Sequence, residues 1–186
     1  MKQYDFRFDE TLIRSFIGRI LTKYEHAECI HTNSVTGILG FKIDAQVFEL
    51  TNEYEGIDFF TLDNEATIFR ISKSEWNRIE TSINKEINET DVNEKITKVV
   101  LVNDHTTLHI NQNAEYDMWD TKAIIFYFEN FEICFAKQDC WFSQEIEIYK
   151  GYNLIEKVGD GKDILSDFNT NDSKSIYVER SFRVIE

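Results

Sequence analysis

Hydrophobic residues alternate with polar ones along most of the chain, at the two-residue period of β-strands that bury one face. Two pairs of stretches show the pattern in related forms. Residues 19–26 and 98–105 each begin with a basic residue, continue as an apolar segment and end in an acid and a histidine. Residues 39–50 and 124–135 each alternate on both sides of a short polar turn, which is typical of a β-hairpin.

This similarity predicts two related β-rich units, residues 9–71 and 73–149, followed by a closing strand over residues 175–185. With 186 residues, the chain is long enough to bury a core without disulfide bonds. The polar stretch between the units is too short for an interdomain linker. We therefore expect one domain over residues 1–186.

Three segments have helical spacing instead. The sequence predicts helices over residues 9–17 and 73–88, the second after a capping box formed by Ser72 and Glu75, and a short helical turn near residues 163–168. A longer first helix that continues into the next apolar segment is the alternative. The expected fold class is α+β: a mostly antiparallel β-sheet with two or three helices.

The chain is strongly acidic, with 34 Asp and Glu against 20 Lys and Arg and a formal net charge of −14. Nucleic-acid and anionic-membrane binding normally need a basic surface, and the sequence contains no cluster of Lys or Arg, so neither partner is expected. The charge favours solubility first, and it also suits a basic protein partner.

Three cysteines at irregular spacing indicate no disulfide framework, and residues 1–5 lack the apolar core of a signal peptide. No apolar run approaches the roughly 20 residues of a membrane-spanning helix. We therefore expect a cytoplasmic protein, either a monomer or a homodimer.

His26 and His105 are the low-ranked catalytic candidates, because they occupy equivalent places in the two units and each follows an acid. An acid–histidine pair within one strand cannot hydrogen-bond, since neighbouring side chains point to opposite faces. A cleft between the units that joins His26 and His105 would suit a small hydrolase-like or metal-dependent enzyme. Two ordinary histidines at strand ends are the alternative.

Cys29 and His31 are the strongest candidates for metal ligands. Residues two apart on one strand share a face and lie about 6.6 Å apart, so both could bind one zinc ion. Two further ligands would be needed, and no Cys-x-x-Cys or His-Glu-x-x-His spacing supplies them. We therefore predict neither a metal site nor a cofactor.

Tyr116, Met118 and Trp119 lie in a polar segment, residues 111–120, that is predicted to be a loop. Aromatic side chains are costly to expose and are enriched at interfaces, so these three are the predicted binding residues. A lid that folds back over the sheet is the alternative.

Four stretches of the chain, residues 33–37, 50–53, 143–146 and 151–157, resemble segments of small acidic proteins from low-GC Gram-positive bacteria. The resemblance implies no activity, cofactor or catalytic residue. The sequence also has neither a glycine-rich phosphate loop nor a Gly-x-Ser-x-Gly elbow. The leading hypothesis is thus a non-enzymatic binding protein, for example an immunity-type protein that blocks a basic toxin.

Overall fold

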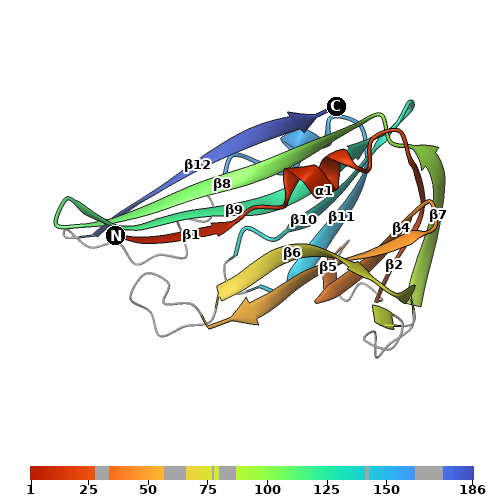
Figure 1. Cartoon of the computed structure of the whole chain (residues 1–186). Helices are drawn as coiled ribbons and strands as arrows, with labels where there is room; N and C mark the ends of the chain where they lie inside the picture. The colour runs from red at the N-terminus through yellow and green to blue at the C-terminus, as the bar shows by residue number, and fades with distance from the viewer. Residues whose placement is uncertain (28–33, 57–65, 77, 80–86, 141–142, 162–173) are drawn as a thin grey trace.

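The molecule consists of two β-sheets, one above the other, with the N-terminal segment along one side (Figure 1). The fold is seen in a computed structural model. It describes the following residues: 1–27, 34–56, 66–76, 78–79, 87–140, 143–161 and 174–186. In this part of the chain, no helix is long and apolar enough to cross a membrane.

The lower sheet in Figure 1 has five strands in the order β6-β5-β4-β2-β7, and all neighbours are antiparallel. All five lie within residues 20–95. Their bounds are β2 (Ile20–Ala27), β4 (Ile38–Ile43), β5 (Gln46–Glu55), β6 (Ala66–Ser74) and β7 (Ile87–Lys95).

The upper sheet has seven strands. Six follow the order β12-β8-β9-β10-β11-β3 with antiparallel neighbours, and β1 pairs with β9 in parallel. Their bounds are β1 (Lys2–Phe6), β3 (Ser34–Thr36), β8 (Lys98–Ile110), β9 (Asn113–Tyr127), β10 (Glu132–Lys137), β11 (Glu145–Gly151) and β12 (Lys174–Ile185).

The predicted α+β class is wrong, because the described part of the chain is almost entirely β. The helix predicted over residues 9–17 is only five residues long, α1 (Glu10–Arg14), with Asp9 as its N-cap. A single 3₁₀ turn, η1 (Leu154–Glu156), also lies among the described residues. The turn predicted near residues 163–168 lies outside the described residues.

The helix predicted over residues 73–88 is wrong at both of its ends. Its first residues belong to β6 and its last to β7, and only a helical turn at Trp76, Arg78 and Ile79 is described between them. Ser72 does not cap a helix, because it lies within β6, where its hydroxyl donates to the carboxylate of Glu49 on the neighbouring strand. The pairing of β6 with β5 thus takes the place of the predicted start of the helix.

The main core lies between the two sheets and is rich in phenylalanine. Phe16, which follows α1, packs its ring 4.8 Å from Phe48 and 6.1 Å from Phe41 of the lower sheet. Phe41 in turn contacts Phe126 of the upper sheet, with ring centroids 5.7 Å apart. These four rings are fully buried and join both sheets to the N-terminal segment.

The two hairpins that were matched in the sequence form comparable groups of strands. In the lower sheet β4 lies between β2 and β5, and in the upper sheet β9 lies between β8 and β10. Each group is antiparallel. An internal repeat over residues 9–71 and 73–149 remains a prediction, because a shared three-strand arrangement is common among β-proteins.

The face of the upper sheet that packs against the lower sheet differs between the two ends of β8. In β8, the odd-numbered Val99 and Leu101 lie in the main core, whereas the even-numbered Leu108 belongs to a second cluster with Ala66 of β6. Long strands twist, and a register shift in the middle of the β8–β9 pair adds to that twist. At this end of β8, odd-numbered residues such as His105 therefore face away from the lower sheet.

Candidate functional site

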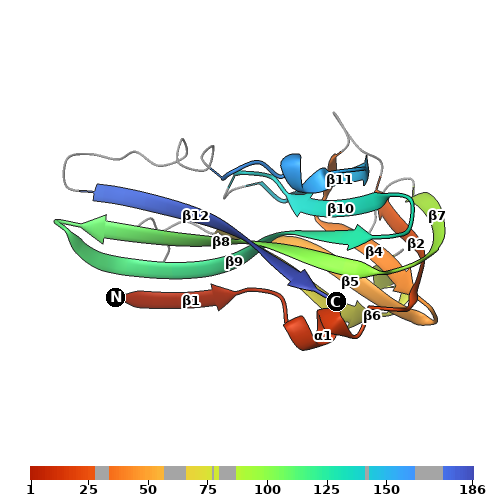
Figure 2. The same ribbon diagram turned by 90° about the horizontal axis from the view of Figure 1, so that it is seen from above.

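The candidate site lies on the open face of the upper sheet, where β1, β9 and β8 run side by side and no other described element covers them (Figure 2). The strand register places Asp5 of β1 beside Trp119 of β9, and Trp119 beside His105 of β8. All three point outward, because the alternating residues, such as the fully buried Met118, point inward.

The indole ring of Trp119 is held by neighbours from both flanking strands. The imidazole of His105 stacks on it with centroids 4.2 Å apart and planes inclined by 6°. Directly after β1, the guanidinium carbon of Arg7 lies 4.7 Å from the ring centroid. This cation–π and stacking arrangement fixes the ring on the surface of the sheet.

Arg7 is itself fixed by Asp5. Its Nε and Nη2 donate to the two carboxylate oxygens of Asp5 at 2.9 and 2.6 Å, and its backbone N–H donates at 3.1 Å. The side-chain hydrogen bonds from Arg7 lower the pKa of the Asp5 carboxyl, although partial burial opposes them. The pair therefore stays ionised, and the Arg7 side chain is oriented before any ligand arrives.

His105 is oriented by a second carboxylate, that of Asp117. Its Nε2 lies 2.7 Å from Oδ1 of Asp117, and both side chains are about one-quarter exposed. Asp117, Trp119 and Asp5 line a hollow of about 290 Å³ together with Gln3 and Tyr4. We call this hollow, with the flanking His105 and Arg7, the Trp119 groove.

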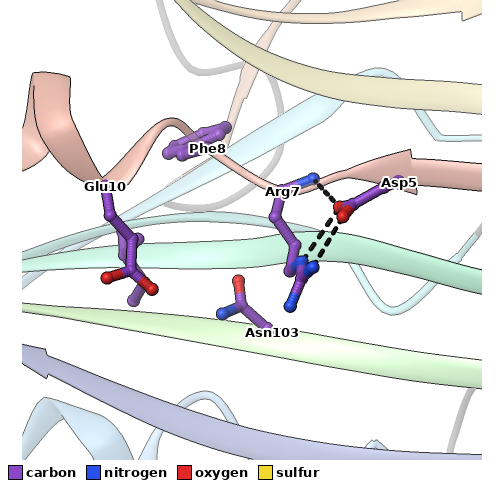
Figure 3. A pocket seen from close by; sticks show the side chains of 6 residues that line it. Asp5, Arg7, Phe8, Glu10 and Asn103 are labelled. Atoms are coloured by element: carbon purple, nitrogen blue, oxygen red, sulfur yellow. Dashed lines mark hydrogen bonds and ion pairs between the residues drawn. The ribbon is translucent and has the colours of Figure 1, made fainter.

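A second hollow, of about 400 Å³, adjoins the Trp119 groove (Figure 3). Figure 3 shows Arg7 on one side of Asn103 and Glu10 of α1 on the other. Six residues line this hollow, which we call the Asn103 pocket: Asp5, Arg7, Phe8, Glu10, Leu101 and Asn103. The two hollows share Asp5, so they form one continuous polar surface.

The three predicted binding residues do not lie together. Residues 113–127 form a strand instead of the expected loop, so Tyr116 and Met118 point inward and are buried against Leu108. Trp119 points outward and is half-buried. The alternation was readable in the sequence, but the polar outward positions were mistaken for a loop. A binding role for Trp119 remains a prediction.

The two candidate catalytic histidines belong to different sheets and have different partners. His26 lies in β2, is buried, stacks on Tyr24 and has its Nδ1 2.5 Å from the carbonyl oxygen of Ala27. Burial lowers the pKa of His26. His105 lies in β8 on the open face. The two histidines thus do not share a cleft.

Cys29 and His31 lie outside the described residues. Within the described ranges, no group of three or more His, Cys, Asp or Glu side chains could hold a metal ion. Cys134 is buried in a strand of the upper sheet, and burial raises the pKa of its thiol. A buried thiol of this kind is a packing residue.

Sequence reasoning missed a buried network of ion pairs behind the open face. Arg180 of β12 binds the carboxylate of Asp104 through Nε and Nη2, both at 2.7 Å, and that of Asp139 at 2.9 Å. Lys122 binds Asp139 at 2.8 Å, and Lys137 binds Asp120. Three acids balance three bases in this network, so it carries no net formal charge.

Burial shifts several protonation equilibria in this network. Desolvation raises the pKa of Asp120 and lowers that of Lys122. For Asp139, the attraction of Lys122 and Arg180 outweighs the opposing effect of burial and lowers the pKa. None of these side chains lines either hollow. Because the network connects β8, β9, β10 and β12, we interpret it as structural.

The residues that shape the site were difficult to find from the sequence alone. Asp5 and Arg7 have the two-residue spacing of a strand, but nothing local indicates that β1 pairs with β9. Asp117 was passed over because the pairing of His105 with a diagonal neighbour depends on strand register. The chain matches no protein-family model, no curated protein and no solved structure, so the function is argued from this geometry.

Proposed function

We propose that the chain is a non-enzymatic binding protein whose Trp119 groove receives a basic segment of a protein partner. The observation that carries the proposal is an ordered, half-buried tryptophan beside the carboxylates of Asp5 and Asp117 on an open sheet face. Protein interfaces commonly centre on an aromatic side chain with a polar rim.

The charge of the chain supports a basic partner. The formal net charge is −14, and the groove contributes two carboxylates, with Glu179 of β12 paired opposite His105 at its margin. Long-range attraction to such a surface raises association rates and weakens with added salt. Asp5 and Arg7 offset each other's charge, so Asp117 is the carboxylate of the groove that an incoming Lys or Arg would meet.

The hydrolase-like alternative has no specific observation in its favour. His26 and His105 lie in separate sheets. Among the described residues, His105 is paired with Asp117 and stacked on Trp119, and no hydroxyl or thiol hydrogen-bonds its ring. An oriented histidine without a nucleophile suits a fixed recognition surface better than acyl transfer.

The test is a titration with fluorescently labelled peptides in two series, one rich in Lys and Arg and one rich in Glu, read by fluorescence anisotropy. We expect the basic series to bind, and its affinity to fall as salt rises from low to physiological concentration. Asp117→Asn should weaken binding about tenfold, the effect of losing roughly 1.4 kcal/mol.

Glu53→Gln is the matched control, because it removes the same charge from an exposed position in the lower sheet. It should leave the affinity within about twofold, since a distant exposed charge is screened. Equal binding of both peptide series, or an equal loss from Asp117→Asn and Glu53→Gln, would refute recognition at the groove.

A further inference from the structure

The Asn103 pocket has hydrogen-bond donors that the protein itself does not use. Asn103 has 7% exposure, and its Oδ1 accepts a hydrogen bond from the hydroxyl of Thr121 at 2.9 Å. Its amide nitrogen has no acceptor among the described residues. Asn103 lines the hollow, so this amide can donate to an acceptor on a molecule bound there.

Arg7 supplies a second donor beside that amide. Its Nε and Nη2 are bonded to Asp5, which leaves Nη1 free of that carboxylate. Figure 3 shows this third nitrogen on the side of the guanidinium that is turned away from Asp5. These two donors line the same pocket, and the guanidinium carries a positive charge, so together they form a recognition pair for a carboxylate.

The opposite side of the pocket is anionic. Glu10 projects from α1 into the hollow, and Arg183 of β12 holds its carboxylate at 3.0 and 3.1 Å. The Glu10 side chain is 46% exposed, so its oxygens still have lone pairs free for another donor. The pocket therefore has the donor of Arg7 on one side of Asn103 and the acceptor oxygens of Glu10 on the other.

We propose that the Asn103 pocket binds a zwitterion of the α-amino-acid class. The ligand carboxylate would accept hydrogen bonds from Nη1 of Arg7 and the amide of Asn103, and its ammonium group would donate to Glu10. Phe8 and Leu101 line the pocket and suit the apolar carbons between these groups.

Each simpler ligand fits only half of the pocket. A plain carboxylate would leave the free lone pairs of Glu10 without a donor, whereas a plain amine would leave the two donors without an acceptor. The volume of about 400 Å³ lies within the range of about 300–1,000 Å³ that is usual for small-molecule sites. The proposal goes beyond the binding of a basic protein, because it concerns a neighbouring hollow and another class of ligand.

The experiment is isothermal titration calorimetry of the full chain with matched sets of three compounds. Each set holds an amino acid, the acid without its amino group and the amine without its carboxyl group: alanine, propionate and ethylamine, and likewise leucine, isocaproate and isoamylamine. We expect at least one amino acid to bind, and both of its partial analogues to bind more than tenfold more weakly.

Asn103→Asp is the decisive variant, because it keeps the oxygen that accepts from Thr121 and replaces the amide donor by a carboxylate oxygen. It should abolish binding, and Glu10→Gln should weaken it about tenfold. Circular dichroism and thermal unfolding of each variant establish that the fold is retained, and a variant that unfolds is replaced by Arg7→Lys, which removes the second donor.

Three results would overturn the proposal: no binding of either amino acid, equal binding of a partial analogue, or unchanged affinity in Asn103→Asp. Asp117→Asn, which alters the Trp119 groove, should leave amino-acid affinity unchanged. That variant therefore separates failure of this proposal from failure of the proposed protein binding.

Discussion

Strands β2 and β8 have similar sequences, Arg19–His26 and Lys98–His105, yet their two histidines have different surroundings. His26 is buried against Tyr24 in the lower sheet, whereas His105 stacks on Trp119 at the open face of the upper sheet. The local pattern is the same in both strands. The neighbouring strands and the twist of the sheet therefore determine whether such a histidine packs in the core or contributes to a surface.

The acids before these histidines show the same contrast. Glu25 and Asp104 are both almost fully buried. Glu25 pairs with Lys23 of its own strand at 2.7 Å. Burial raises the pKa of the Glu25 carboxyl, and the nearby Glu89 raises it further. Asp104 instead pairs with Arg180, far away in the chain. One acid has a local, partly exposed partner and the other a buried one that connects strands.

The largest expected effect comes from breaking the contact between the two matched hairpins. Phe41→Ala and Phe126→Ala should each lower the free energy of unfolding by about 3–5 kcal/mol, because each creates a cavity in the shared core. Urea denaturation measures both, and the double variant should lose less than the sum because the rings touch.

Phe182→Ala is the control for this pair, since Phe182 is 48% exposed on β12. It should cost less than about 1 kcal/mol. If the losses at Phe41 and Phe126 were no larger than the loss at Phe182, the two hairpins would not share a core.

The next largest expected effect is a difference in stability between removing the partner of Asp104 and removing the partner of Glu25. Arg180→Met leaves Asp104 without its counter-charge and removes one of the two basic partners of Asp139, so it should cost about 3–5 kcal/mol of unfolding free energy. Lys23→Met removes the partner of Glu25, but Lys23 is one-fifth exposed and Glu25 can take up a proton, so it should cost about 1 kcal/mol or less. Chemical denaturation of both variants at neutral pH makes the comparison, and equal losses would contradict it.

A smaller, pH-dependent effect identifies the buried histidine. The folded-state pKa of His26 lies below 6.5, so between that pKa and 6.5 the unfolded chain binds more protons than the folded one. His26 thus lowers stability as pH falls through this window, and its contribution is constant above it. Denaturation across this pH range should show the decline, and His26→Gln should reduce it. An unchanged pH dependence in His26→Gln would show that His26 is not the responsible group.

The smallest effect concerns the exposed histidine. His105→Gln should lower the unfolding free energy by only about 0.5–1 kcal/mol, the usual worth of one aromatic stack, and should change the fluorescence of the neighbouring Trp119. His109→Gln, which removes a more distant edge contact with Tyr177 at 5.5 Å, is the control and should leave the fluorescence unchanged. A loss above about 3 kcal/mol in His105→Gln would place His105 in the core instead.

Much of the β-structure could be predicted because alternation is a local property. The hairpin over residues 39–50 and its turn at Asp44, which adopts the left-handed backbone conformation, follow from nearby residues. The helix over residues 73–88 could not be judged locally. At its start, the pairing of β6 with β5 outweighs the helical spacing.

The candidate site was only partly predictable. Trp119 was selected as an exposed aromatic residue, but its neighbours Arg7, His105 and Asp117 come together through two strand pairings and a register shift. Asn103 carries no signal at all in the sequence, because its exposure to the pocket follows from the twist of β8.

The parallel pairing of β1 with β9 has a consequence during synthesis of the chain. Lys2 lies beside Tyr116, which is added 114 residues later. At about 5–20 residues per second on the ribosome, the first strand waits roughly 6–23 s before its partner exists. Until then β1 has no strand to pair with, so its backbone hydrogen-bonding groups are open to strand edges of other nascent chains.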